Sequence, residues 1–136
     1  MNASMTIPSD VQQLPKVRQF AFDFARKLGA SEKVAHRTEF IATELCSNAI
    51  EYGGGIGKIT IELDNDNSSI RIICFNQTKE SSVSMRLKEK FHADFDPVQK
   101  RGRGLFIIRN WVKEANFEDT DGGVRISVVQ SLSEYA

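Results

Sequence analysis

Strand patterns in this sequence occur in adjacent pairs, and this order limits the possible folds more than any other feature. Residues 58–63, KITIEL, alternate apolar and polar side chains, and IRIICF, residues 70–75, follows after the polar run DNDNSS. This pattern predicts a β-hairpin with one buried face. A second pair, ANFEDT and VRISVVQSL, is joined by the turn DGG and predicts a closing hairpin whose inward face is Val124, Ile126 and Val128.

The first part of the chain predicts two amphipathic helices. Val17, Phe20, Phe24 and Leu28 lie three and four residues apart, and Gly29 is a natural stop. Ser31 can cap a second, longer helix from about Glu32 to Tyr52, which the run GGGIG ends. Its inward residues are expected to be Val34, Ile41, Leu45 and Ala49.

The region between the hairpins is less regular. Residues 77–101 show no clear period and predict a mobile loop, with a possible short helix at SMRLKEKF, and a third long helix is expected at about Leu105 to Ala115. The order is thus helix, helix, hairpin, loop, helix, hairpin. Because the strands cluster, a two-layer α+β sandwich is favoured over a doubly wound parallel sheet.

Composition narrows the classes of function. The 136 residues are expected to form a single domain, residues 1–136, and the 18 basic and 18 acidic residues balance. The chain therefore lacks the broad positive field of a nucleic-acid or anionic-membrane binder.

Cys46 and Cys74 lie in apolar segments and are interpreted as buried, reduced thiols. With no signal peptide or membrane span in the sequence, a cytoplasmic protein is expected.

The segment RGRG, immediately before the third predicted helix, indicates an anion site. Gly102 and Gly104 would let the backbone approach a phosphate closely, and the first N–H groups of the helix would face it. Arg101 and Arg103 would add charge-assisted hydrogen bonds. A flexible surface turn is the alternative reading of this tetrapeptide taken alone.

The segment ELCSNAIEYG places a carboxylate and an amide on one helix face. Glu44 and Asn48 are four residues apart and are therefore neighbours on successive turns. An amide oxygen is a suitable Mg²⁺ ligand, and a carboxylate one turn away can deprotonate an attacking hydroxyl. An ordinary solvated helix face is the alternative for this pair alone.

Together these segments resemble the anti-sigma-factor serine/threonine kinases of the GHKL ATPase superfamily. ELCSNAIEYG is similar to the N box of that family, and RGRGLFIIRNWVKE is similar to its G2 box. The resemblance implies a Bergerat-type fold, with three main helices on one face of a mixed, mostly antiparallel sheet. It implies Glu44 as the catalytic base and Asn48 as the Mg²⁺ ligand. The triphosphate of ATP would be held by Gly102, Gly104 and the backbone that follows, including Leu105 and Phe106.

The sequence departs from this family in the first glycine box. Asn76 lies where the family has the aspartate that reads adenine, and Thr78 and Glu80 lie where it has glycines. Asn76 can still accept one hydrogen bond from the base, and Thr78 is expected to line the nucleotide. A threonine held at positive φ costs about 1–3 kcal/mol unless the loop is rebuilt. A carboxylate at position 80 would repel a triphosphate.

The resemblance implies an enzyme that uses Mg²⁺ and ATP to phosphorylate a STAS-domain anti-anti-sigma antagonist. It also implies a partner-switching homodimer that sequesters a sigma factor or a related regulator. Arg18, exposed on the first helix, is the residue expected to bind a partner, although a solvated basic face is an equal alternative. Because the first glycine box is altered, the other hypothesis is a non-catalytic binding module of the same fold.

Overall fold

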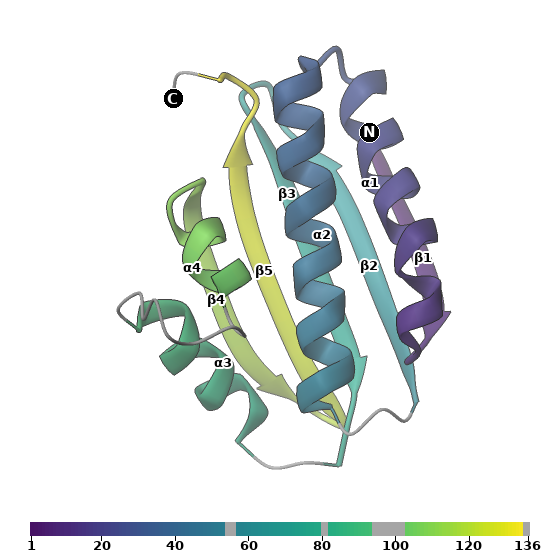
Figure 1. Ribbon diagram of the computed structural model, residues 1–136, viewed down its shortest axis with the longest axis vertical. Helices are drawn as coiled ribbons and strands as arrows, with labels where there is room; N and C mark the ends of the chain where they lie inside the picture. The colour runs from purple at the N-terminus through teal and green to yellow at the C-terminus, as the bar shows by residue number, and fades with distance from the viewer. Residues whose placement is uncertain (54–56, 80–81, 94–102, 135–136) are drawn as a thin grey trace.

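One face of a five-stranded sheet carries all the described helices (Figure 1). The computed structural model describes residues 1–53, 57–79, 82–93 and 103–134, and of Arg103 it describes the backbone alone. The strand order is β1-β2-β3-β5-β4. All four neighbouring pairs are antiparallel, so the expectation of a mixed sheet is corrected within the described residues, while the α+β two-layer class is confirmed.

The elements follow in this order: β1 (Asn2–Pro8), a 3₁₀ turn (Val11–Gln13), α1 (Leu14–Lys27), α2 (Glu32–Tyr52), β2 (Lys58–Asn65), β3 (Ser69–Gln77), α3 (Val83–His92), α4 (Arg103–Arg109), β4 (Val112–Thr120) and β5 (Gly123–Ser131). Helices α1 and α2 lie side by side over β1, β2 and β3 (Figure 1). Helices α3 and α4 cover the β4 side of the sheet. This arrangement leaves the other face of the sheet uncovered by any described helix.

Helix α2 forms as its sequence predicts. The Ser31 side chain accepts a hydrogen bond from the Val34 backbone N–H at 3.2 Å, and the four residues predicted to face inward are each at most 1% exposed. A buried polar contact fixes the helix to the sheet. The Thr38 hydroxyl and Gln130 Oε1 on β5 are 2.8 Å apart, and Gln130 Nε2 donates to the Val34 carbonyl at 3.4 Å.

The third predicted helix is too long. Helix α4 ends at Arg109, and the residues up to Ala115, predicted as helical, instead begin strand β4 at Val112. The last turn tightens, since the N–H of Trp111 bonds to the Ile108 carbonyl at 2.8 Å. The Trp111 ring then packs edge-on against Phe40 of α2, with ring centroids 5.4 Å apart. This contact and pairing with β5 override the local helical pattern.

Two further segments differ from the sequence analysis. Strand β1 was not predicted, although Ala3, Met5 and Ile7 alternate toward the core and the strand pairs with β2. Part of the predicted loop at residues 77–101 forms helix α3, as the SMRLKEKF pattern suggested, while residues 80–81 and 94–102 lie outside the described residues. No helix in the described ranges has both the length and the apolar character to cross a membrane.

Candidate functional site

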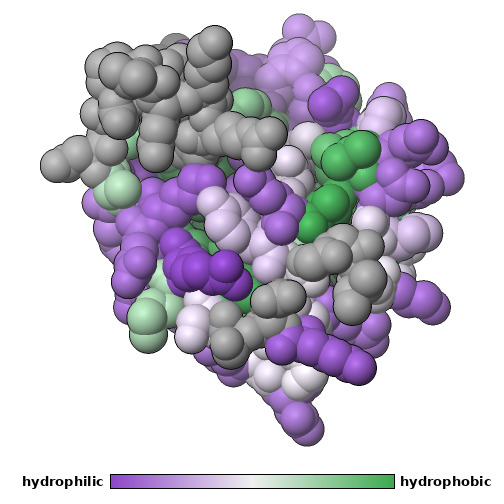
Figure 2. All heavy atoms as spheres, turned by 60° about the horizontal axis from the view of Figure 1, so that its bottom comes forward, coloured by the Kyte–Doolittle hydropathy of each residue, from purple (hydrophilic) through white to green (hydrophobic). Residues whose placement is uncertain are grey.

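Apart from Arg18, the predicted site residues that the structure describes lie on the last turns of α2, at the end of β3 and at the start of α4. Helix α2 ends at the lower end of the molecule in Figure 1. Strand β3 ends there as well, and the Thr78 hydroxyl donates to the Gly53 carbonyl at 3.1 Å. Helix α4 begins against α2 at Glu44, about two turns before α2 ends, where a Cβ at Gly104 would overlap the carboxyl group of Glu44. Figure 2 views the molecule from this end and shows a mostly hydrophilic surface with small hydrophobic patches.

Glu44 and Asn48 form a hydrogen-bonded pair. The side-chain nitrogen of Asn48 donates to the Glu44 carbonyl at 2.8 Å and to the Glu44 carboxylate at 3.3 Å. Both amide hydrogens of Asn48 are thus used within α2. Its Oδ1 accepts no hydrogen bond from a described residue, so both lone pairs of this oxygen are available to a ligand. Asn48 is 4% exposed, so this oxygen belongs to a sheltered site.

Burial raises the pKa of the Glu44 carboxyl above its usual range. The hydrogen bond from Asn48 and the positive charge of Lys90 act in the opposite direction and offset part of this rise, while Glu51 adds to it. A half-buried carboxylate with a raised pKa is a stronger base than a solvated one. Glu44 is therefore suited to accept a proton from a hydroxyl held beside it.

Lys90 is a site residue that sequence analysis missed. It belongs to α3, donates a hydrogen bond to the Tyr52 hydroxyl, and lies 4.7 Å from the centroid of the Tyr52 ring. Arg86, one turn earlier, lies 5.9 Å from the same centroid. Helix α3 is thus held against the end of α2 by two cations on one aromatic ring. The spacing of Arg86 and Lys90 across a possible short helix was the only sequence signal of this contact.

Asn76 lies on the inner face of β3 and is 2% exposed. Its side-chain nitrogen has no hydrogen-bond partner among the described residues. The amide occupies space that the absence of a side chain at Gly53 leaves open, since a Cβ there would lie 2.5 Å from Nδ2. An unsatisfied buried donor costs about 1–3 kcal/mol, so this position is suited to a ligand acceptor.

Thr78 fits its place without the strain expected of a residue replacing glycine. Ser82, with φ of 60°, is the one non-glycine with positive φ in the described part of the chain. The Thr78 N–H bonds to the Gly122 carbonyl at 3.2 Å, which fixes the residue after β3 to the turn between β4 and β5. Thr78 therefore does not adopt a positive φ, and the strain expected of a threonine in place of glycine does not arise at this residue.

The predicted phosphate segment is described in part. Arg101, Gly102 and Glu80 lie outside the described residues, as does the side chain of Arg103. Gly104 and Leu105 are buried in α4, and Phe106 is half-buried beside Arg109, whose guanidinium carbon lies 4.8 Å from the Phe106 ring centroid. Of these residues, Gly104 is the one whose backbone lies against the Glu44 carboxyl group.

Arg18 lies apart from this site. It is exposed on α1 and lines a shallow hollow of about 370 Å³ between α1 and α2. The other side chains of this hollow include Phe22, His36 and Glu39. The Phe22 and His36 rings pack against each other, tilted by 46° with centroids 5.0 Å apart, which gives the hollow an apolar floor beside a cation.

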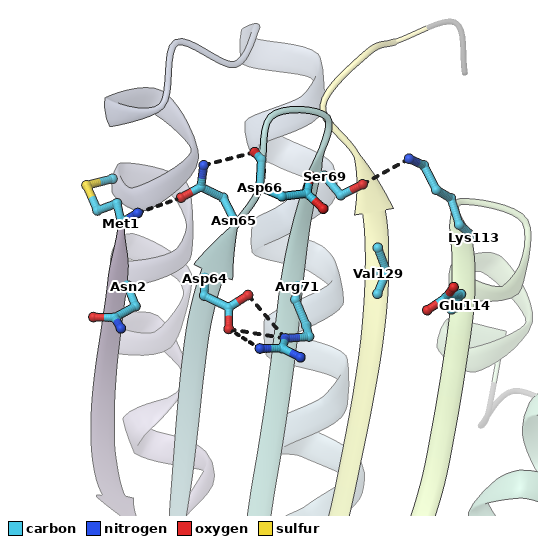
Figure 3. A pocket seen from close by; sticks show the side chains of 10 residues that line it. All are labelled: Met1, Asn2, Asp64, Asn65, Asp66, Ser69, Arg71, Lys113, Glu114 and Val129. Carbon is cyan, nitrogen blue, oxygen red and sulfur yellow. Dashed lines mark hydrogen bonds and ion pairs between the residues drawn. The ribbon is translucent and has the colours of Figure 1, made fainter.

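A larger hollow of about 810 Å³ lies at the opposite end of β2 and β3, on the face of the sheet away from the helices (Figure 3). Several of its polar and charged side chains contact one another. Arg71 contacts both carboxylate oxygens of Asp64 at 2.5–3.1 Å, and Lys113 donates to the Ser69 hydroxyl at 2.9 Å. These contacts engage Arg71, Asp64 and Lys113, and this hollow contains none of the predicted site residues.

Comparisons with known proteins agree with the fold. A chain of the SiaB–SiaC complex from Pseudomonas aeruginosa superposes with a TM-score of 0.66 at 16% identity, covering 95% of this chain and 89% of that one. The catalytic domain of the histidine kinase ThkA, in a nucleotide-free form, gives a TM-score of 0.55 at 19% identity, covering 95% of both chains. No curated protein matches the sequence.

The sequence profile of the histidine kinase-like ATPase domain matches residues 7–129. The matched range runs from the end of β1 to the last strand and includes Glu44, Asn48, Asn76 and Gly104. This range covers most of the chain and agrees with the resemblance found in the sequence. The protein belongs to the histidine kinase-like ATPase domain family.

Proposed function

We propose that this protein is an ATP-dependent serine/threonine kinase that switches between partners. It transfers the γ-phosphate of ATP to a hydroxyl of a STAS-domain anti-anti-sigma antagonist, and it sequesters a sigma factor or a related regulator as a homodimer. The observation that carries the proposal is the hydrogen-bonded pair of Glu44 and Asn48, with Gly104 packed against the Glu44 carboxyl group. Family membership and the similarity to a chain of the SiaB–SiaC complex support it.

In this reaction the oxygen of the serine or threonine hydroxyl bonds to the γ-phosphorus. The bond from that phosphorus to the bridging oxygen of the β-phosphate breaks, and ADP leaves. Glu44 takes the hydroxyl proton, which its raised pKa favours. Oδ1 of Asn48 would hold Mg²⁺, which would neutralise charge on the β- and γ-phosphates.

A transfer assay tests the catalytic role of Glu44. The pure protein is incubated with radiolabelled ATP and a STAS-domain protein from the same genome. Glu44→Gln keeps the size of the side chain and the oxygen that accepts from Asn48 but removes the base, so transfer is expected to fall by about 100-fold or more. Glu32→Gln, exposed in the first turn of α2 and outside both the candidate site and the hollow beside Arg18, is the control and is expected to retain activity. Equal transfer by wild type and Glu44→Gln would contradict the proposed mechanism.

A binding module without catalysis is the second candidate, favoured by the neutral Asn76 in place of a carboxylate. Calorimetry with Mg·ATP separates the two. Saturable binding that disappears in Asn48→Ala is expected for the kinase, whereas no heat of binding in the wild type supports the module.

We also propose that Arg18 binds an acidic partner through the hollow between α1 and α2. Exposure of the guanidinium beside an apolar floor supports this assignment. Arg18→Glu is expected to weaken capture of the STAS-domain protein or the sigma factor, while Lys27→Glu, also exposed on α1 but outside the hollow, is expected to leave it unchanged. Capture that is unaffected by Arg18→Glu would remove this assignment.

A further inference from the structure

The side-chain nitrogen of Asn76 has no hydrogen-bond partner among the described residues. Nδ2 of Asn76 and the Thr120 hydroxyl are the two buried side-chain polar atoms in the described ranges that lack a hydrogen bond. Asn76 is the more deeply enclosed of the two residues, at 2% exposure on the inner face of β3. Buried polar atoms without partners are rare in folded proteins, and each calls for a specific explanation. A ligand atom that accepts a hydrogen bond from Asn76 would supply that explanation.

The surroundings of Asn76 fit a nucleotide that extends from Asn48. Asn48 lies in the last turns of α2, and Gly53, the C-cap residue of that helix, follows five residues later, or about 7.5 Å along a helix axis. Gly53 lies directly beside the Asn76 amide, since a Cβ at Gly53 would come 2.5 Å from Nδ2, so backbone alone covers the amide on that side. A nucleoside triphosphate with its phosphates at Asn48 is long enough to bring its base to this amide. The inference therefore rests on nucleotide binding as set out under Proposed function.

The chemistry of a carboxamide then decides which base fits. A carboxylate only accepts hydrogen bonds, whereas a carboxamide has an acceptor and a donor side by side. Adenine presents an amino donor at position 6, and guanine presents an oxygen acceptor there. Rotation of the asparagine side chain about its last torsion, which is soft, exchanges the donor and the acceptor. An asparagine can therefore pair with a purine that carries either group, but an aspartate would place a negative oxygen against a 6-oxo group.

We propose that Asn76 reads position 6 of a bound purine and makes this site accept 6-oxopurine nucleotides, those of guanine and hypoxanthine, as well as adenine nucleotides. The buried, unpartnered Nδ2 supplies the donor that a 6-oxo group requires. Asn76 is thus the residue that sets base specificity, and its neutral amide broadens the range of nucleotides rather than merely weakening the binding of ATP.

Calorimetry of the full chain with Mg·ATP and with Mg·ITP tests this proposal. The hypoxanthine base of ITP differs from adenine only in carrying a 6-oxo group and a proton on N1. The wild type is expected to bind both with dissociation constants within about threefold of each other. Asn76→Asp keeps the size of the side chain but removes the donor, and it is expected to raise the ratio of the ITP constant to the ATP constant at least tenfold, or about 1.4 kcal/mol.

Two results would overturn the proposal: a wild type that prefers ATP by more than about tenfold, or an Asn76→Asp variant with an unchanged ratio.

If that variant does not fold, the triphosphate of purine riboside, which has no group at position 6, decides the matter on the wild type. It is expected to bind about tenfold more weakly than both ATP and ITP, and binding as tight as theirs would overturn the proposal. If no nucleotide binds, the proposed function itself fails, which distinguishes the two failures.

Discussion

At the scale of single residues, the raised pKa of the Glu44 carboxyl that favours its proposed role as a base also makes the stability of the fold depend on pH. Because burial raises its pKa, the folded protein holds a proton on Glu44 over a pH range in which the unfolded chain has released it. Stability from this group is therefore full at low pH and is lost as the pH rises through the folded-state pKa. Glu44→Gln is expected to increase the free energy of unfolding at neutral pH.

Urea unfolding of wild type and Glu44→Gln at several pH values measures this difference. The two curves are expected to converge below about pH 4, where Glu44 is protonated in both the folded and the unfolded state. A variant that is less stable than wild type at pH 7 would contradict the cause assigned to the raised pKa.

Gly104 and Gly29 are glycines for two different reasons. Gly104 leaves room for the Glu44 side chain, whereas Gly29 adopts a positive φ. A methyl group at position 104 would overlap the carboxyl end of Glu44, a flexible side chain that can move away. Gly104→Ala is therefore expected to leave stability nearly unchanged and to reduce the proposed phosphoryl transfer by about 100-fold, because the base is displaced.

Gly29→Ala is the contrasting variant. Gly29 has φ of 86° with open space around it, so alanine there is expected to cost about 1 kcal/mol of stability without changing transfer. Urea unfolding and the transfer assay, run on both variants, measure the two effects separately. Equal losses of transfer in Gly104→Ala and Gly29→Ala would show that the contact between Gly104 and Glu44 has no specific role.

At the scale of elements, the contact of Thr38 with Gln130 holds α2 on β5. Thr38→Val removes the hydroxyl and leaves the 2%-exposed Gln130 amide without one of its partners, at an expected cost of about 1–3 kcal/mol. Replacing both residues, as Thr38→Val with Gln130→Leu, is expected to recover part of the loss because no buried polar group remains unpaired. Urea unfolding of the three proteins measures these effects, and a double variant that is less stable than the sum of the single ones would contradict this account.

The elements that sequence predicted best are those whose local signals agree with their packing. Helix α2 has a capping serine, a regular apolar stripe and a glycine run after it, and its bounds are as predicted. The β2–β3 and β4–β5 hairpins follow from alternation and turn residues, although β4 begins before its predicted start. The prediction of a helix at residues 110–115 is wrong because two long-range contacts override the local pattern. These are the packing of Trp111 on Phe40 and the pairing with β5, and neither is a local property of the sequence.

The site could be predicted only as far as spacing along one helix allows. The bond between Glu44 and Asn48 follows from their separation of four residues. The contact of Gly104 with Glu44 joins residues 60 positions apart, and that of Lys90 with Tyr52 joins residues 38 apart. Neither pair has a local pattern that fixes its partner. Spacing also cannot reveal that the Asn76 donor lacks a partner, because that depends on every side chain packed around it.

At the scale of the whole molecule, the two buried thiols report on how the helices separate from the sheet. Cys46 on α2 is 0% exposed, and Cys74 on β3 is 1% exposed. Contact with Cys46 and burial both raise the pKa of the Cys74 thiol well above its usual range. The reactive thiolate is therefore scarce while the protein is folded. A thiol reagent is expected to react only when α2 lifts from the sheet.

The rate of labelling by an aromatic disulfide reagent is then expected to follow the equilibrium for opening. Thr38→Val, which loosens α2 without touching either thiol, should raise the rate by about tenfold for each 1.4 kcal/mol of stability that it removes. Ser31→Ala, which removes the cap of α2, is a second variant and should fall on the same line. Rates that are fast in the wild type and equal in all three proteins would mean that the thiols are reached without separating α2 from β3. The helix layer and the sheet would then not open as one cooperative unit.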